Sequence, residues 1–79
     1  MKYQLITDEI KINTNDIIKK PSGELFKVVG LSVSNSGFLD DQNFYITPYP
    51  VEFTYTIVDK KIPINKVILI NDQWEKRLA

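Results

Sequence analysis

Residues 16–33 have the sequence DIIKKPSGELFKVVGLSV, and this stretch predicts a β-hairpin. Two runs rich in β-branched residues flank Pro21–Gly23, where proline fixes φ and glycine permits the positive φ of a tight turn. In the second run the apolar side chains change face after Val28, and Gly30 stands at the change. A glycine there indicates a β-bulge or a sharp bend. We therefore expect one long, bent strand that serves two parts of a curved sheet.

The composition favours the same class of fold. Eleven Ile and six Val stand against a single Ala. β-branched side chains suit a pleated surface and are stiff in a helix, whereas alanine is the best helix former. With 79 residues, 43% hydrophobic and 25% charged, the chain suits one soluble globular domain over residues 1–79. The expected class is all-β, with at most one short helix.

Other segments extend this pattern to five or six short antiparallel strands. Alternation or apolar runs predict further strands at Tyr3–Ile6, Ile10–Ile12, Asn43–Thr47, Glu52–Val58 and Lys66–Ile70. Ile62–Asn65 contains a proline and is interpreted as an irregular or 3₁₀ connection. Asn71 and Asp72 favour a helix cap, so we expect a short C-terminal helical turn at Gln73–Leu78, with Trp74 packed on Leu78.

The order of elements from Asn15 to Ile70 resembles that of SH3-like barrels. The resemblance rests on an apolar pair, a Pro-Ser-Gly turn, the bent strand LFKVVGL (residues 25–31), a long loop and strands at Phe53–Val58 and Val67–Ile70, with Ile62-Pro63-Ile64 between them. It implies a small open barrel that binds peptides, proteins or nucleic acid. The chain lacks an acidic run after the first hairpin and an Ala-Leu-Tyr opening strand, so recognition of proline-rich ligands does not carry over. Fold alone does not decide function.

Several classes of chemistry lack their residues. The chain has no His and no Cys, which excludes a Cys–His dyad, a disulfide framework and the usual zinc sites. The adjacent pairs Asp8-Glu9 and Asp40-Asp41 would point to opposite faces of a strand, so neither is preset to share a proton. Asp40 and Asp41 with Asn43 offer oxygen ligands, but their spacing matches no calcium loop. We expect a non-enzymatic protein with no catalytic residue, cofactor or metal.

The charge balance and the apolar runs bound the location and the partners. Ten basic and ten acidic residues give zero net charge, evenly divided between the two halves of the chain. The longest apolar run, Val67–Ile70, is far shorter than a membrane span or a signal peptide requires. We therefore expect a cytoplasmic protein that does not enter a membrane. Nine Lys against one Arg, with six Asn, indicate an AT-rich genome.

The segment of residues 34–50 holds four of the nine aromatic residues. One interpretation places these side chains inside the barrel as a plug. The other leaves some of them exposed as a protein-binding patch, since a small core cannot absorb every aromatic, or lets Asn43–Thr47 pair with a partner strand. The predicted contact residues are Phe38, Phe44, Tyr45 and Tyr49, with Asp40 and Asp41 as the polar rim. The preferred function is a protein-binding module, such as a phage or mobile-element accessory protein that modulates a host protein.

Two alternatives stay open. A nucleic-acid-binding barrel would use a lysine patch assembled from two turns, with nearby aromatics for base stacking; its residues are Lys19, Lys20, Lys60, Lys61 and Lys66. A homo-oligomer would instead seal its own aromatic patch. Trp74, beside three charged residues, is interpreted as a hydrophobic lid on the core, with a partner anchor as the alternative.

Overall fold

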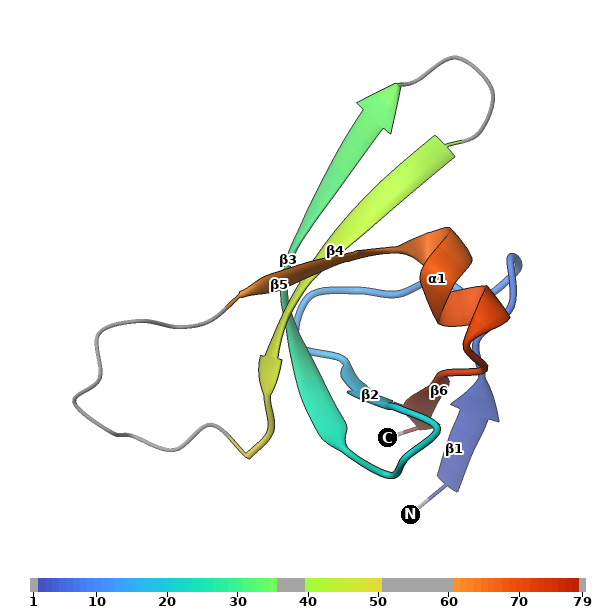
Figure 1. The fold of residues 1–79 in the computed structure, drawn as a ribbon, viewed down its shortest axis with the longest axis vertical. Helices are drawn as coiled ribbons and strands as arrows, with labels where there is room; N and C mark the ends of the chain where they lie inside the picture. Colours follow the sequence, from blue (N-terminus) through green and yellow to red (C-terminus); the bar gives the residue numbers. More distant parts are fainter. Residues whose placement is uncertain (1, 36–39, 51–60, 79) are drawn as a thin grey trace, which may run out of the picture.

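The computed structural model describes residues 2–35, 40–50 and 61–78. Its elements are β1 (Lys2–Leu5), β2 (Ile17–Lys19), β3 (Leu25–Asn35), β4 (Asp40–Pro48), β5 (Ile62–Asn65), α1 (Lys66–Asn71) and β6 (Glu75–Leu78). The strands form one antiparallel sheet in the order β1-β6-β2-β3-β4-β5 (Figure 1). The all-β prediction is confirmed. The sheet is open, because no pairing in these ranges joins the edge strands β1 and β5.

The hairpin predicted from residues 16–33 is present. Lys19 pairs with Leu25, and between them the Lys20 N–H donates to the Glu24 carbonyl at 2.8 Å. Gly23 has φ +98°, the left-handed conformation that the turn requires. The register of β3 against β4 shifts between Val28 and Gly30, which confirms the predicted irregularity at that glycine.

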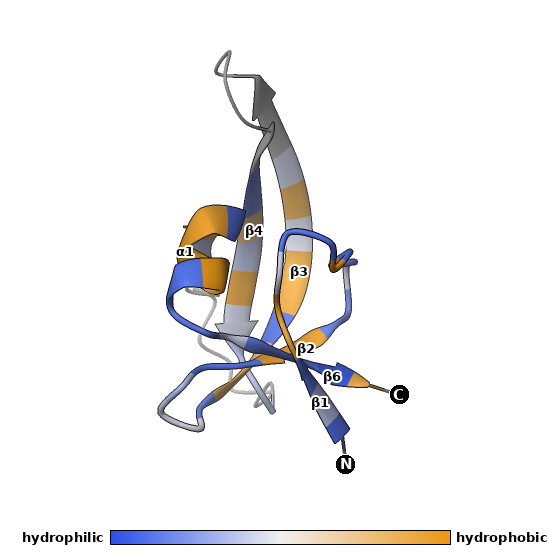
Figure 2. Cartoon of the chain, turned by 90° about the vertical axis from the view of Figure 1, so that its right-hand side faces the viewer, coloured by the Kyte–Doolittle hydropathy of each residue, from blue (hydrophilic) through white to orange (hydrophobic). Residues whose placement is uncertain are grey.

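The last third of the chain differs from the prediction in two places. Residues 66–70, expected as a strand, lie in α1 (Lys66–Asn71; Figure 2), where the Asn65 side chain accepts a hydrogen bond from the Ile68 N–H at 2.8 Å. This N-cap starts a helix within a β-favouring sequence. Ile62–Asn65 is the regular edge strand β5 and not an irregular connection.

The predicted C-terminal helical turn is also wrong. Residues 75–78 form β6, which inserts between β1 and β2 and pairs with both. Trp74 precedes the strand and packs against Phe26, with ring centroids 5.5 Å apart, while Leu78 is exposed. The lid interpretation of Trp74 holds, because the residue is buried in the core, and within the described residues its Nε1 has no hydrogen-bond partner.

The strand predicted at Asn43–Thr47 is confirmed and is longer, since β4 runs from Asp40 to Pro48. β3 likewise reaches Asn35, so most of the presumed long connection after it belongs to a β3–β4 hairpin. The strand predicted at Glu52–Val58 lies outside the described residues.

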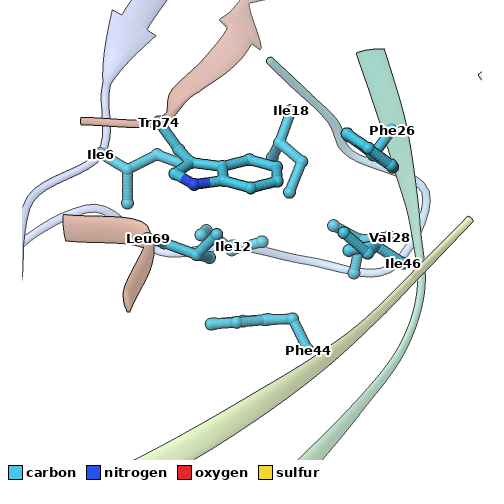
Figure 3. Close-up of a cluster of buried hydrophobic side chains, with 9 residues drawn as sticks. All are labelled: Ile6, Ile12, Ile18, Phe26, Val28, Phe44, Ile46, Leu69 and Trp74. Carbon is cyan, nitrogen blue, oxygen red and sulfur yellow. The ribbon is translucent and has the colours of Figure 1, made fainter. Parts of the chain in front are cut away.

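The core lies on one face of the sheet (Figure 3). It is built from side chains of the sheet, the segment between β1 and β2, α1, and the residue before β6: Ile6, Ile12, Ile18, Phe26, Val28, Phe44, Ile46, Leu69 and Trp74. Ile10–Ile12 is not a strand, yet Ile12 is buried. Two lysines hold this covering segment in place. The Lys66 amine donates to the Asp8 carbonyl at 2.7 Å, and the Lys76 amine to the Lys11 carbonyl at 2.8 Å.

One end of the β3–β4 hairpin projects from the rest of the molecule (Figure 1). β5 pairs with β4 only from Asn43 to Ile46, and β2 pairs with β3 only from Leu25 to Lys27. Beyond these, residues 33–35 of β3 pair only with residues 40–42 of β4 in the described part of the chain. We call these two stretches the arm and the remainder of the sheet the body.

Candidate interaction surface

Strand β4 separates the predicted contact residues onto two faces. Phe44 and Ile46 point into the core, and Phe44 has 0% of its surface exposed. Tyr45, between them, lies on the opposite, outer face of the sheet. Phe44 is thus held in the core and offers no surface to a partner in this fold. Phe44 and Ile46 are apolar residues two positions apart, and this alternation was the sequence signal for the burial of Phe44. The sequence interpretation grouped the aromatic residues by segment and not by strand face, so it missed this signal.

The Tyr45 ring packs over Gly30 of the neighbouring strand β3. A Cβ added to Gly30 would lie 3.7 Å from the Tyr45 Cδ2, so the ring covers this glycine in ordinary contact. Tyr45, Gly30, Val29 and Lys61 line a shallow hollow of about 230 Å³ on the outer face. Tyr45 itself is half-buried. A partner bound in this hollow would contact an aromatic ring that packs on Gly30, with the cation of Lys61 beside it.

Tyr49 extends the same face toward the other end of β4. It follows the strand by one residue, and its backbone N–H donates to the Leu25 carbonyl at 2.9 Å. By alternation it shares the outer face with Tyr45 and Thr47, and it is half-buried. Two of the predicted aromatic contacts therefore lie on one face of the sheet, Tyr45 within β4 and Tyr49 just after its end.

The remaining predicted contacts belong to the far end of the hairpin. Asp40 and Asp41 begin β4, where their backbones pair with Asn35 and Ser34. Phe38 lies outside the described residues. The predicted partner-binding set is thus distributed over the core, the outer face and the arm.

The four described lysines of the alternative prediction lie on separate parts of the fold. Lys61 and Lys66 flank the four residues of β5 at opposite ends, roughly 16 Å apart along the strand. Lys19 lies on β2, which β3 and β4 separate from β5. Lys20 is exposed at the hairpin turn, and Lys60 lies outside the described residues.

Two of these amines already have partners. The Lys66 amine binds the Asp8 carbonyl, as described above. The Lys19 Nζ lies 3.5 Å from a Glu75 carboxylate oxygen and 4.1 Å from the centroid of the Tyr3 ring. Both contacts compete with a phosphate for the amine.

Lys27 is an outer-face residue that the sequence interpretation missed. It pairs with Thr47 on β4 and with Ile17 on β2. Since Thr47 lies between Tyr45 and Tyr49 in the sequence, Lys27 lies opposite the middle of that stretch. Its alternation with the buried Phe26 and Val28 was the available signal. The outer face near Tyr45 therefore carries two cations, Lys27 and Lys61.

A second hollow lies beside the paired strands β2 and β6, near the start of β2. Its volume is about 370 Å³, and its lining residues are Asn15, Asp16, Ile17, Lys76, Arg77 and Leu78. Within it the Lys76 amine lies 3.2 Å from an Asp16 carboxylate oxygen, which also accepts the Asn13 N–H at 2.7 Å. The Lys76–Asp16 ion pair at this hollow thus helps to fix the loop before β2.

Among the residues that the structure describes, no three acidic, histidine or cysteine side chains gather into a metal-binding group. In the same ranges, no helix has the length and apolar character to cross a bilayer, and α1 has only six residues. Comparison with known proteins found no matching family model, no matching curated protein and no matching solved structure.

Proposed function

We propose that this chain is a non-catalytic protein-binding module that grips its partner with the arm and the outer face of β4. The observation that carries the proposal is the arm itself. A two-stranded ribbon is only marginally stable in water, and this ribbon extends past the core with no third strand beside it in the described ranges. A surface built this way gains most when a partner packs against it.

The positions of the predicted contacts support the same surface. Tyr45 and Tyr49 share the outer face of the sheet, and aromatic side chains of this kind are enriched at protein interfaces. Asp40 and Asp41 begin the same strand at its far end. One strand thus links the aromatic and acidic contacts.

We further propose that the open sheet is a small SH3-like barrel. Successive hairpins from β2 to β5, followed by a short helix and a last strand that returns to β2, support an SH3-like open barrel. Such barrels are mostly binding modules. The lysine-rich, arginine-poor composition supports an accessory protein of a phage or mobile element that modulates a host protein.

The test is capture of a partner by tagged protein, followed by reconstitution of the purified pair. We expect Tyr45→Ser and Asp41→Lys each to weaken the reconstituted complex at least about tenfold, as loss of a central contact does. Tyr3→Ser is the matched control, because Tyr3 is also half-buried but lies on β1, beyond two intervening strands from β3. Equal binding by all three variants would contradict the proposal.

Nucleic-acid binding is the second candidate, and one observation favours it. Lys27 and Lys61 flank the outer-face position of Tyr45 and Thr47, which places two cations near an aromatic ring. A mobility assay at low salt with single-stranded DNA and RNA tests it. Retention should fall steeply with added salt and in Lys27→Glu; absence of retention at low salt excludes this candidate.

A further inference from the structure

The free edges of this sheet differ in how they are protected. Exposed strand edges invite pairing with other chains, and proteins block them with charges, proline or very short strands. β5 carries Pro63 at its centre, and the free stretch of β4 begins with Asp40 and Asp41. β1 has four residues and begins with Lys2. Each of these edges has a recognised block.

The edge of β3 that faces away from β4, from Gly30 to Asn35, has none of these blocks. Its sequence, GLSVSN, contains no charge and no proline. In the described ranges β2 covers β3 only from Leu25 to Lys27, with Asn15 and Asp16 bonded to Val28. This is an uncharged edge of six residues.

Ladder alternation identifies the free backbone groups on this edge. The Val28 N–H and carbonyl bond to Asp16 and Asn15, so they face away from β4. The backbone groups of successive β4 residues point in alternate directions, toward β3 and away from it. Beyond the bulge, Gly30 and Ser32 pair with Tyr45 and Asn43, so the backbone groups of Gly30 and Ser32 face β4. The backbone groups of Leu31 and Val33 then point outward. The same alternation turns the Pro63 nitrogen to the free side of β5, as expected for an edge proline.

We propose that the Gly30–Asn35 edge of β3 pairs antiparallel with the same edge of a second copy of this chain. A two-fold axis beside Ser32 places Leu31 opposite the second copy's Val33, and Ser32 opposite the second copy's Ser32. Leu31 and Val33 then exchange both of their outward backbone bonds. Apolar residues meet apolar residues on one face, and small polar residues meet on the other, which is a favourable set of cross-strand pairs.

The occupant is a second copy because the segment is complementary to itself. Two-fold pairing of a charged edge would bring like charges together, whereas this edge has no charge to oppose itself. Leu31 is 44% exposed and gains a neighbour in the pair. A two-fold contact uses the one edge of each copy and stops at a dimer. The interface is small, so we expect a weak dimer that depends on concentration.

Sedimentation velocity over a range of protein concentrations tests the pairing. We expect the wild-type chain to shift from monomer to dimer and Leu31→Lys to raise the dissociation constant at least about tenfold, because two lysines then meet near the axis. Ile62→Lys is the matched control: Ile62 is 48% exposed and belongs to the proline-blocked edge. A wild-type monomer at all concentrations, or equal loss in both variants, overturns the proposal.

Cross-linking tests the register in a chain that has no native cysteine. Opposed residues that do not exchange bonds have Cα atoms about 4.5 Å apart, and a disulfide spans about 4.4–6.8 Å. Ser32→Cys should therefore oxidise to a covalent dimer, while Ser34→Cys, which faces the second copy's Gly30, should stay mostly monomeric. Equal cross-linking of the two variants would indicate random collision and overturn the pairing. Circular dichroism establishes that each variant is folded.

Discussion

The two ends of the β3–β4 hairpin belong to the same pair of strands but differ in their surroundings: one end lies in the body and the other is the arm. In the body, Val28 and Ile46 face each other across the ladder and both are buried in the core. In the arm, Val33 and Gln42 continue that ladder without a third strand in the described ranges. In the described ranges the body has three or more paired strands over a buried core, whereas the arm has two paired strands. Burial supplies most of the stability, so the two ends should respond very differently to perturbation.

The largest effect is expected where burial ends. Phe44→Ala removes the fully buried core residue nearest the arm on β4 and should lower the free energy of unfolding by about 3–5 kcal/mol. Tyr45→Ala, at the next position on the outer face, should cost less than half as much. Urea denaturation followed by circular dichroism measures both. Similar losses in the two variants would show that the outer face is packed as tightly as the core.

Hydrogen exchange compares the two ends within one molecule. At a protein concentration where the chain is monomeric, the amides of the body should exchange only on global unfolding. Those of the arm should open at a free energy lower by about 3 kcal/mol, because in the described ranges no third strand pairs with the ribbon there. NMR-detected exchange gives both values. Equal protection would mean that the arm unfolds as part of the body.

Removing the amine that holds the covering segment should have an intermediate effect. Lys76→Met keeps the aliphatic stem but leaves Asp16 and the Lys11 carbonyl without this donor, at a cost of about 1–3 kcal/mol. Lys19→Met is the matched control. The side chains of the Lys19–Glu75 ion pair are 31% and 39% exposed, so the free energy of unfolding should fall by less than about 1 kcal/mol. A larger loss for Lys19 than for Lys76, measured by urea denaturation, would reverse this assignment.

The smallest effects concern the two glycines of β3 and its turn. Gly23→Ala meets no atom within 4 Å but adopts φ +98°, so it should cost about 1 kcal/mol of backbone strain. Gly30→Ala has no positive φ, and its Cβ meets only the Tyr45 ring at ordinary contact distance, so it should change stability by less than about 0.5 kcal/mol. Thermal melting compares the pair. A larger loss at Gly30 would show that the bulge requires glycine.

Local signals identified the β2–β3 hairpin and its bend. The turn at Pro21–Gly23 and the irregularity at Gly30 follow from backbone preferences that no distant contact opposes. The burial of Phe44 was also available in the sequence, because it alternates with the outer-face Tyr45. Assigning the aromatics by strand face would have placed it in the core.

The C-terminal third depends on distant contacts. Residues 67–70, VILI, favour a strand by propensity, yet the Asn65 cap and the burial of Leu69 stabilise one short helix there. Residues 75–78, EKRL, favour a helix, yet pairing with β1 and β2 makes them a strand. The partners of that strand lie near the other end of the chain, and no local pattern specifies them. The arm likewise follows from where β2 and β5 stop pairing.

The burial of Trp74 has a practical consequence. It is the single tryptophan of the chain, and it lies in the core with its ring beside Phe26. Because the Trp74 side chain is 3% exposed, its indole should emit at a blue-shifted wavelength only while the body is intact. A partner bound to the arm or to the outer face should leave this emission unchanged, whereas loss of the core should shift it to the red. The chain thus carries an intrinsic fluorescent probe that separates binding at its surface from unfolding of its interior.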